Sequence, residues 1–171
     1  MGGNTLNYEE IIQDLVSTGS DELISNSDTN HAKVLIRYLF KTSRNRICIF
    51  SSQLNDHIYD DDEVISEIER FVEKDGQVEI LLQQPGDFDK SRKIFKLMRE
   101  FKNRISVKSV TNITDSEIDP HFVVNDNNGF RFCEDKKKTS AIASFNRAKT
   151  AKNLIEQFDI LFKRAQEFSR A

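Results

Sequence analysis

The sequence has few cysteines: Cys48 and Cys133 are the only two among 171 residues. Two cysteines cannot form the dense disulfide framework that stabilises small secreted domains. The sequence also has no Cys-x-x-Cys pair and no close His-Cys pair, so the ligand spacing typical of a zinc site is missing. Both cysteines fall in predicted strands, and Cys48 lies in an apolar run. We therefore expect Cys48 to be a buried free thiol.

Long apolar runs are missing as well. No stretch approaches the ~20 apolar residues that a membrane-spanning helix needs. Residues 1–10 contain no basic region followed by an apolar core, which excludes the usual pattern of a secretory signal. Leu6 stands where the myristoylation pattern requires Ser or Thr. We expect a cytoplasmic protein without a membrane partner.

Tryptophan is absent, yet 13 phenylalanines and a hydrophobic content of 37% suffice for a real core. The length corresponds to about one domain. The net charge is only -3, so no overall basic excess indicates nucleic acid as an obligatory partner. The sequence also contains no internal repeat, no Gly-rich phosphate loop and no Gly-x-Ser-x-Gly elbow.

An acidic run at Asp60, Asp61 and Asp62 is the one feature that invites a metal. Its spacing does not match an EF-hand loop, which needs alternating ligands, a glycine in the middle and a glutamate at the end. Negative side chains are favourable at the start of a helix. We therefore interpret the run as the cap and first turn of the next helix, and expect no metal or cofactor.

Apolar spacing predicts helices at residues 7–17, 30–43, about 62–74, 89–101 and 147–168, with strands between most of them. Asn7 and Glu10 form a capping-box pattern at the first helix. Gly76 is expected to end the third helix in a left-handed conformation, and Asp87 or Asp89 to cap the fourth. Residues 17–29 are polar and predict a linker. We expect the first helix and linker at 1–29, and one domain at 30–171.

The chain is organised around residues 121–146. Polar and apolar residues alternate around Val123 and Val124, and the run Asn-Asp-Asn-Asn-Gly at 125–129 predicts a tight turn. A return strand and a charged loop follow, and then a third apolar run ends at Ser144. The expected sheet contains strands at 47–50, 78–82, 105–107, 122–124, 130–132 and 141–144.

This stretch resembles the phospholipase D-like superfamily, whose motif is His-x-Lys, then an aspartate and a Gly-Ser-x-Asn step. His121 matches the histidine, and Val123 stands at the lysine position. Asp126 lies near the aspartate position, while Asn128 occupies the regular spacing. The Ala-Ser-Phe-Asn run that contains Ser144 and Asn146 resembles Gly-Ser-x-Asn without its glycine. The resemblance extends over about residues 30–164.

The resemblance implies an α/β phospholipase D-like half-domain, with a mixed central sheet and helices on both faces. It implies phosphodiester cleavage through a phosphohistidine at His121, supported by Asp126, Ser144 and Asn146. Two motifs form one site in this superfamily, so a chain carrying one motif implies a homodimer. Val123 removes the main cation on the phosphate, and losing such a contact lowers the rate ~100-fold or more.

We therefore expect a non-catalytic domain that serves as a subunit or adaptor in a bacterial or phage assembly for nucleic-acid processing or antiviral defence. A divergent dimeric nuclease or phosphodiesterase that uses His121 is the first alternative. A nucleic-acid-binding module is the second. Its candidate phosphate-binding residues are basic side chains from one helix face and one loop: Lys90, Arg92, Lys93, Lys96, Arg99, Lys136, Lys137 and Lys138.

Overall fold

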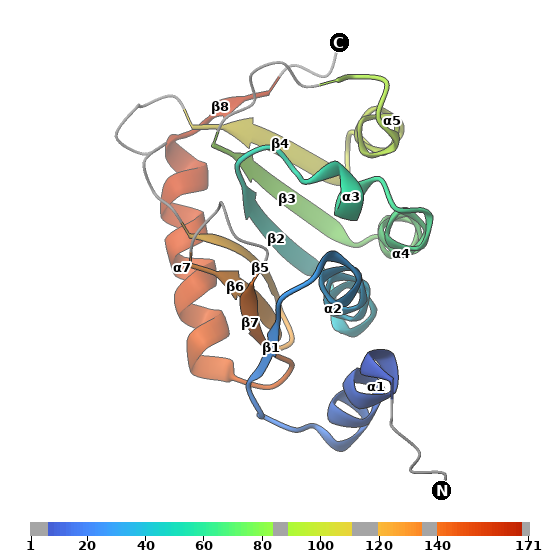
Figure 1. The fold of residues 1–171 in the computed structure, drawn as a ribbon. Coiled ribbons are helices and arrows are strands. Elements are labelled where there is room, and N and C mark those ends of the chain that lie inside the picture. The colour runs from blue at the N-terminus through green and yellow to red at the C-terminus, as the bar shows by residue number, and fades with distance from the viewer. Residues whose placement is uncertain (1–6, 84–88, 111–119, 135–139, 169–171) are drawn as a thin grey trace, which may run out of the picture.

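The computed structural model describes residues 7–83, 89–110, 120–134 and 140–168. These residues form an eight-stranded sheet in the order β1-β7-β6-β5-β2-β3-β4-β8. Figure 1 shows helix α7 on one face of the sheet and the other helices on the opposite face. The fold is thus mixed α/β with helices on both faces, as the sequence predicts. The strands are β1 (Ile24–Asn26), β2 (Arg46–Ser51), β3 (Gln77–Leu82), β4 (Ile105–Ser109), β5 (His121–Asn125), β6 (Phe130–Cys133), β7 (Ala141–Ser144) and β8 (Gln166–Glu167).

The centre of the sheet is parallel and its flanks are antiparallel. Strands β2, β3 and β4 run parallel, while β5 pairs antiparallel with β2 and leads into β6 and β7. Ile49 is the middle of this arrangement, since it pairs with Ile80 on one side and with Val123 on the other. Strands buried on both faces need largely apolar sequence, which explains the apolar run of β2 and that of β3, where only Glu79 interrupts it.

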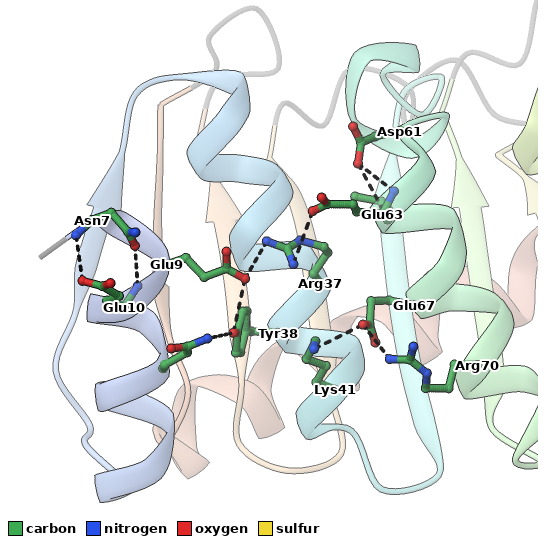
Figure 2. Close-up of polar contacts among 12 residues, drawn as sticks. Asn7, Glu9, Glu10, Arg37, Tyr38, Lys41, Asp61, Glu63, Glu67 and Arg70 are labelled. Atoms are coloured by element: carbon green, nitrogen blue, oxygen red, sulfur yellow. Dashed lines mark hydrogen bonds and ion pairs between the residues drawn. The ribbon is translucent and has the colours of Figure 1, made fainter.

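The larger core lies between the sheet and five helices. They are α1 (Tyr8–Thr18), α2 (Thr29–Thr42), α3 (Asp56–Tyr59), α4 (Asp62–Glu73) and α5 (Lys93–Glu100). Polar contacts join α1, α2 and α4 across their surfaces, with Arg37 of α2 between Glu9 and Glu63 (Figure 2). Ile12 and Leu15 of α1 are buried in the same core. The N-terminal helix therefore packs against its own domain.

The smaller core lies under the single helix α7 (Ala148–Arg164). Ala151, Leu154 and Phe158 of this helix pack against apolar side chains of the opposite sheet face, Phe50 and Phe122 among them. The buried thiol of Cys48 belongs to this core, as its apolar surroundings in the sequence predict. The two cores together bury both faces of the central strands.

Two helix ends differ from the sequence predictions. Asp75, with a φ of 68°, is the left-handed residue after α4, and Gly76 is not. Gly76 is needed for a different reason, since a Cβ there would lie 2.5 Å from the Phe71 ring. Helix α5 begins at Lys93 and has no side-chain cap; Asp89 instead accepts hydrogen bonds from Ser91.

Two strands lie where the sequence predicts other structure. The expected linker contains β1, which pairs with β7 at the edge of the sheet. The expected end of the last helix contains β8, which pairs with β4. The capping box at Asn7 and the cap of α4 by Asp61 are confirmed. Asp87, the expected alternative cap, lies outside the described residues.

Candidate functional site

His121 begins β5, next to the end of β2 and opposite Cys133 of β6. In an open α/β sheet, ligands bind beyond the carboxyl ends of the parallel strands. His121 therefore lies at the edge of the sheet where a site is expected. It is half-buried.

Asp126 lies at the other end of β5, where β2 begins. Its carboxylate accepts hydrogen bonds from the backbone amides of Arg44, Asn45 and Arg46, at 2.8, 2.8 and 3.1 Å. These bonds fix the connection between α2 and β2. The arrangement uses both carboxylate oxygens in the turn and keeps them away from His121.

Ser144 and Asn146 also lie away from His121. Ser144 is fully buried and pairs with Phe130, which in turn pairs with Val124 near the hairpin turn. The side-chain amide of Asn146 donates to the carbonyl of Gly19 at 2.8 Å. The four candidate catalytic residues are thus divided between the two ends of the sheet, and His121 is separated from the other three.

Val123, at the lysine position of the resemblance, is 3% exposed and belongs to the core under the helices. It pairs with Ile49 on one side and with Arg131 of β6 on the other. A lysine at this position would lose its hydration on folding, which is costly without a partner. Valine fits the apolar surroundings on the β2 side.

The basic helix face is largely engaged with neighbouring acidic and carbonyl groups. Arg92 is mostly buried and donates to Asp60 at 3.2 Å and to the carbonyl of Leu54 at 2.7 Å. Lys93 forms an ion pair with Asp62. Lys96 lies 3.9 Å from Glu100, and Arg99 donates to the carbonyl of Lys90 at 3.1 Å. Lys136, Lys137 and Lys138 lie outside the described residues.

A pocket of about 1180 Å³ opens at the same edge of the sheet as His121. The N-terminal segment contributes one part of its wall, and α2, β6, β7 and the start of β5 contribute the rest. The lining residues are Tyr8, Ser25, Asn26, Ser27, His31, Pro120, Phe132, Glu134, Ser140, Ala141 and Ile142. The sequence does not predict this pocket, because part of its wall comes from residues 1–29, which the sequence assigns to a helix and linker outside the domain.

Arg131 is a buried arginine next to this pocket. It is 9% exposed, and its Nε donates to the side-chain oxygen of Asn26 at 3.3 Å. Burial lowers the pKa of Arg131, whereas the neighbouring Tyr59 raises it. Burial also raises the pKa of Tyr59 to about 12. An arginine within the apolar run Phe-Arg-Phe-Cys was the sequence signal that could have revealed this site.

Within the described ranges, no three His, Cys, Asp or Glu side chains are placed to hold a metal ion. No helix in those ranges is long and apolar enough to cross a membrane. The polar groups at the His121 edge can act through hydrogen bonds and through the charge of Arg131.

Solved structures share this fold at low sequence identity. Nuc from Salmonella typhimurium, a phospholipase D family member, has a TM-score of 0.64 and 13% identity, covering 86% of this chain and 97% of its own. TrmBL2, an archaeal chromatin protein, has a TM-score of 0.62 and 14% identity, and the match covers 93% of this chain and 59% of TrmBL2. NucT from Helicobacter pylori has a TM-score of 0.59 and 8% identity, and the match covers 86% of this chain and 100% of NucT.

By sequence, no curated protein matches the chain. The family described as "Domain of unknown function (DUF7931)" matches residues 28–170. This range includes every described element from α2 onward and leaves α1 and β1 outside. The chain therefore belongs to the DUF7931 family, and its fold is phospholipase D-like.

Proposed function

We propose that this chain is a non-catalytic phospholipase D-like domain that works by binding, as a subunit or adaptor of a larger assembly. The observation that carries the proposal is the separation of His121 from Asp126, Ser144 and Asn146. Cleavage through a phosphohistidine needs a histidine and cations around one phosphate, because stabilising the developing charge dominates such a step. A histidine separated from the rest of its motif does not meet that need.

The structural use of the other candidate residues supports the same proposal. Both oxygens of Asp126 accept backbone hydrogen bonds, and Ser144 is closed to solvent. Val123 stands at the lysine position and belongs to an apolar core, so this position supplies no cation to a phosphate. TrmBL2, described as an archaeal chromatin protein with a novel mode of DNA binding, is an example of this fold in a binding protein.

A cleavage assay tests the proposal directly. Purified protein is incubated with single-stranded DNA, double-stranded DNA and a bis-nitrophenyl phosphodiester, with and without EDTA. We expect no turnover above the level of His121→Ala. Metal-independent cleavage that His121→Ala abolishes would overturn the proposal.

We propose a homodimer as the form in which the domain acts, with the His121 edge of the sheet facing the partner. The polar and apolar groups exposed at that edge, Ile142 at 44% among them, are available for contact. Light scattering over a dilution series gives the mass. We expect twice the mass of the chain at high concentration, and a monomer at every concentration would contradict the homodimer.

A second candidate is a divergent phosphodiesterase, and one observation favours it. Arg131 is the direct β6 partner of Val123, so a cation lies one strand away from the position of the missing lysine. Adjacent paired residues on a sheet point to the same face, and the register places His121 on that face as well. In this case both His121→Ala and Arg131→Gln would abolish cleavage, whereas the adaptor proposal expects no cleavage to lose.

A further inference from the structure

The pocket at the His121 edge has a wall made of the N-terminal segment. Tyr8 of α1 and Asn26 of β1 line it, and both precede the region that matches the family, residues 28–170. The opposite wall comes from β6 and β7, where Glu134 and Ser140 lie. Since α1 and β1 complete the pocket, its chemistry belongs to this chain as a whole and not to the matched region alone.

Tyr8 is an unusual wall residue because its hydroxyl is buried. Among the described residues no group forms a hydrogen bond with this hydroxyl. Burial raises the pKa of Tyr8 to about 12, so at neutral pH the phenol carries a proton to donate. A buried donor without an acceptor costs free energy, and an acceptor that reaches it recovers that cost.

Arg131 determines which acceptors are favoured. The positive charge of Arg131 lowers the pKa of Tyr8, an effect larger than the opposite one of the Asp28 carboxylate, and the Arg131 Nε donates to the side chain of Asn26 at 3.3 Å. A charge in a poorly hydrated place acts strongly over short distances, because little water screens it. An anionic acceptor between Tyr8 and Asn26 is therefore favoured over a neutral one.

The residues that line the pocket limit the charge of such an acceptor. Ser27 and Ser140 can donate further hydrogen bonds, whereas Glu134 disfavours a large negative charge. The ring of His31 stacks on Tyr8, with centroids 3.7 Å apart and planes 7° from parallel. Because the Tyr8 hydroxyl is buried, an acceptor reaches it only after these two stacked rings shift.

From these contacts we infer that the pocket binds a small ligand through one anionic oxygen group, a carboxylate or a phosphate monoester. The Tyr8 hydroxyl donates to that group, and Arg131 supplies the positive potential. This inference goes beyond the proposed function, because it requires neither a partner protein nor cleavage.

The position of Tyr8 is fixed by contacts along the rest of α1. Arg37 donates to Glu9 at 2.8 Å, and Gln13 donates to the hydroxyl of Tyr38 at 2.8 Å (Figure 2). These contacts hold α1 on α2, so the helix is already ordered before a ligand binds. Binding therefore requires movement of the Tyr8 and His31 side chains but not of the helix, which limits the entropy lost on binding.

Proton NMR tests the inference on the intact chain. The sequence has three histidines, His31, His57 and His121, so their ring signals form a small, resolvable set. The protein is titrated with inorganic phosphate and, separately, with acetate at constant pH and ionic strength. We expect a saturable shift of the His31 signals with at least one probe, in the millimolar range or tighter. His57, whose side chain is 80% exposed and outside the pocket, should not shift.

Tyr8→Phe separates binding from folding. The variant loses a hydrogen bond to a charged group, so the affinity for the probe that responds should fall about ten- to a hundredfold. The urea midpoint should stay the same or rise, because the variant removes a buried donor without an acceptor. Tyr38→Phe is the comparison variant: it loses the bond to Gln13 but keeps the Tyr8 hydroxyl, so the midpoint should fall while binding weakens much less than in Tyr8→Phe.

The outcomes decide both the inference and the ligand class. If the His31 signals shift with phosphate alone, the ligand carries a phosphate group; if they shift with acetate alone, it carries a carboxylate. A shift with both probes indicates an oxyanion site of low selectivity. No shift of His31 with either probe, equal shifts of all three histidines, or unchanged binding in Tyr8→Phe would each overturn the inference. None of these results depends on cleavage or on the mass of the protein, so failure of the proposed function stays distinguishable.

Discussion

His121 and Asp126 lie at opposite ends of β5, although the resemblance to the phospholipase D-like superfamily assigns both to one site. His121 lies at the edge where the parallel strands end, and Asp126 lies where β2 begins. The extended backbone of β5 produces this separation, since five residue steps at ~3.3 Å each span about 16 Å. The roles of the two residues can therefore be tested independently.

Asp126→Asn tests the role of this carboxylate in folding. The carboxylate accepts three backbone amide hydrogen bonds, and the amide side chain keeps one acceptor but loses the charge. We expect the free energy of unfolding to fall by about 1–2 kcal/mol, near the lower end because two of the bonds are exposed. Urea unfolding measures the change. Asp56→Asn, at a largely exposed carboxylate, should change it by less than about 0.5 kcal/mol. Equal values for the two variants would contradict the assigned role.

Gly76→Ala should destabilise the fold through overpacking. The new Cβ would lie 2.5 Å from the Phe71 ring, which is buried and cannot move away freely. We expect the free energy of unfolding, measured in urea, to fall by about 1–3 kcal/mol.

Gly19→Ala is a useful contrast, since no atom lies within 4 Å of its Cβ and only the left-handed backbone conformation disfavours it. That cost should be about 1–2 kcal/mol, and Gly19→Asn should recover part of it. Gly76→Asn should recover nothing.

Arg46→Lys should weaken the attachment of β2 to β3 and α7. Arg46 donates to both oxygens of Glu79, at 3.0 and 2.9 Å, and also contacts Asp159. Lysine cannot reproduce a bidentate pair, so we expect a loss of about 1 kcal/mol in urea unfolding. Arg70→Lys is the control: Arg70 makes one hydrogen bond to Glu67 and is half exposed, so little change is expected. An equally small effect at Arg46 would refute the structural role.

Alkaline pH should destabilise the protein. Burial raises the pKa of the Cys48 thiol far above its usual range and that of Tyr59 to about 12. Both groups carry a proton in the folded and the unfolded chain below pH ~8.5, so they give no pH dependence there. At higher pH the unfolded chain loses these protons first, so the free energy of unfolding falls.

Urea midpoints between pH 8 and 11 measure this fall. Cys48→Ala is expected to start from a lower midpoint at pH 8 because it leaves a cavity, yet to decline less steeply above pH ~9. Tyr59→Phe should flatten the decline above pH ~10. Slopes identical to wild type in both variants would show that these two groups do not control the alkaline response.

The centre of the sheet could be predicted from sequence because its strands are buried on both faces. The apolar runs around Ile49 and Ile80, and the Asn-Gly turn that ends at Gly129, require no knowledge of the partner strands. β1 could not be predicted in this way. Its three residues, Ile24–Asn26, have no apolar pattern and become a strand only because β7 offers an edge. Tertiary pairing overrides local preference in such a short segment.

The candidate site was harder to predict because sequence spacing does not specify which end of a strand a residue occupies. Ser144 and Asn146 follow His121 in a familiar order, yet β6 and β7 reverse the chain direction and place Ser144 near the hairpin. The sequence does not single out Arg131, because an arginine in a strand is usually exposed. Its burial depends on Asn26, more than a hundred residues earlier in the chain.

Strand β1 has a consequence for the association of separate molecules. It covers the outer edge of β7, whose backbone would otherwise present unpaired donors and acceptors beside the exposed side chain of Ile142. Such edges recruit strands from other molecules and begin aggregation, and natural sheets suppress this with very short edge strands. At three residues, β1 is too short to serve as a template itself. The N-terminal segment therefore also protects the folded chain against edge-to-edge aggregation.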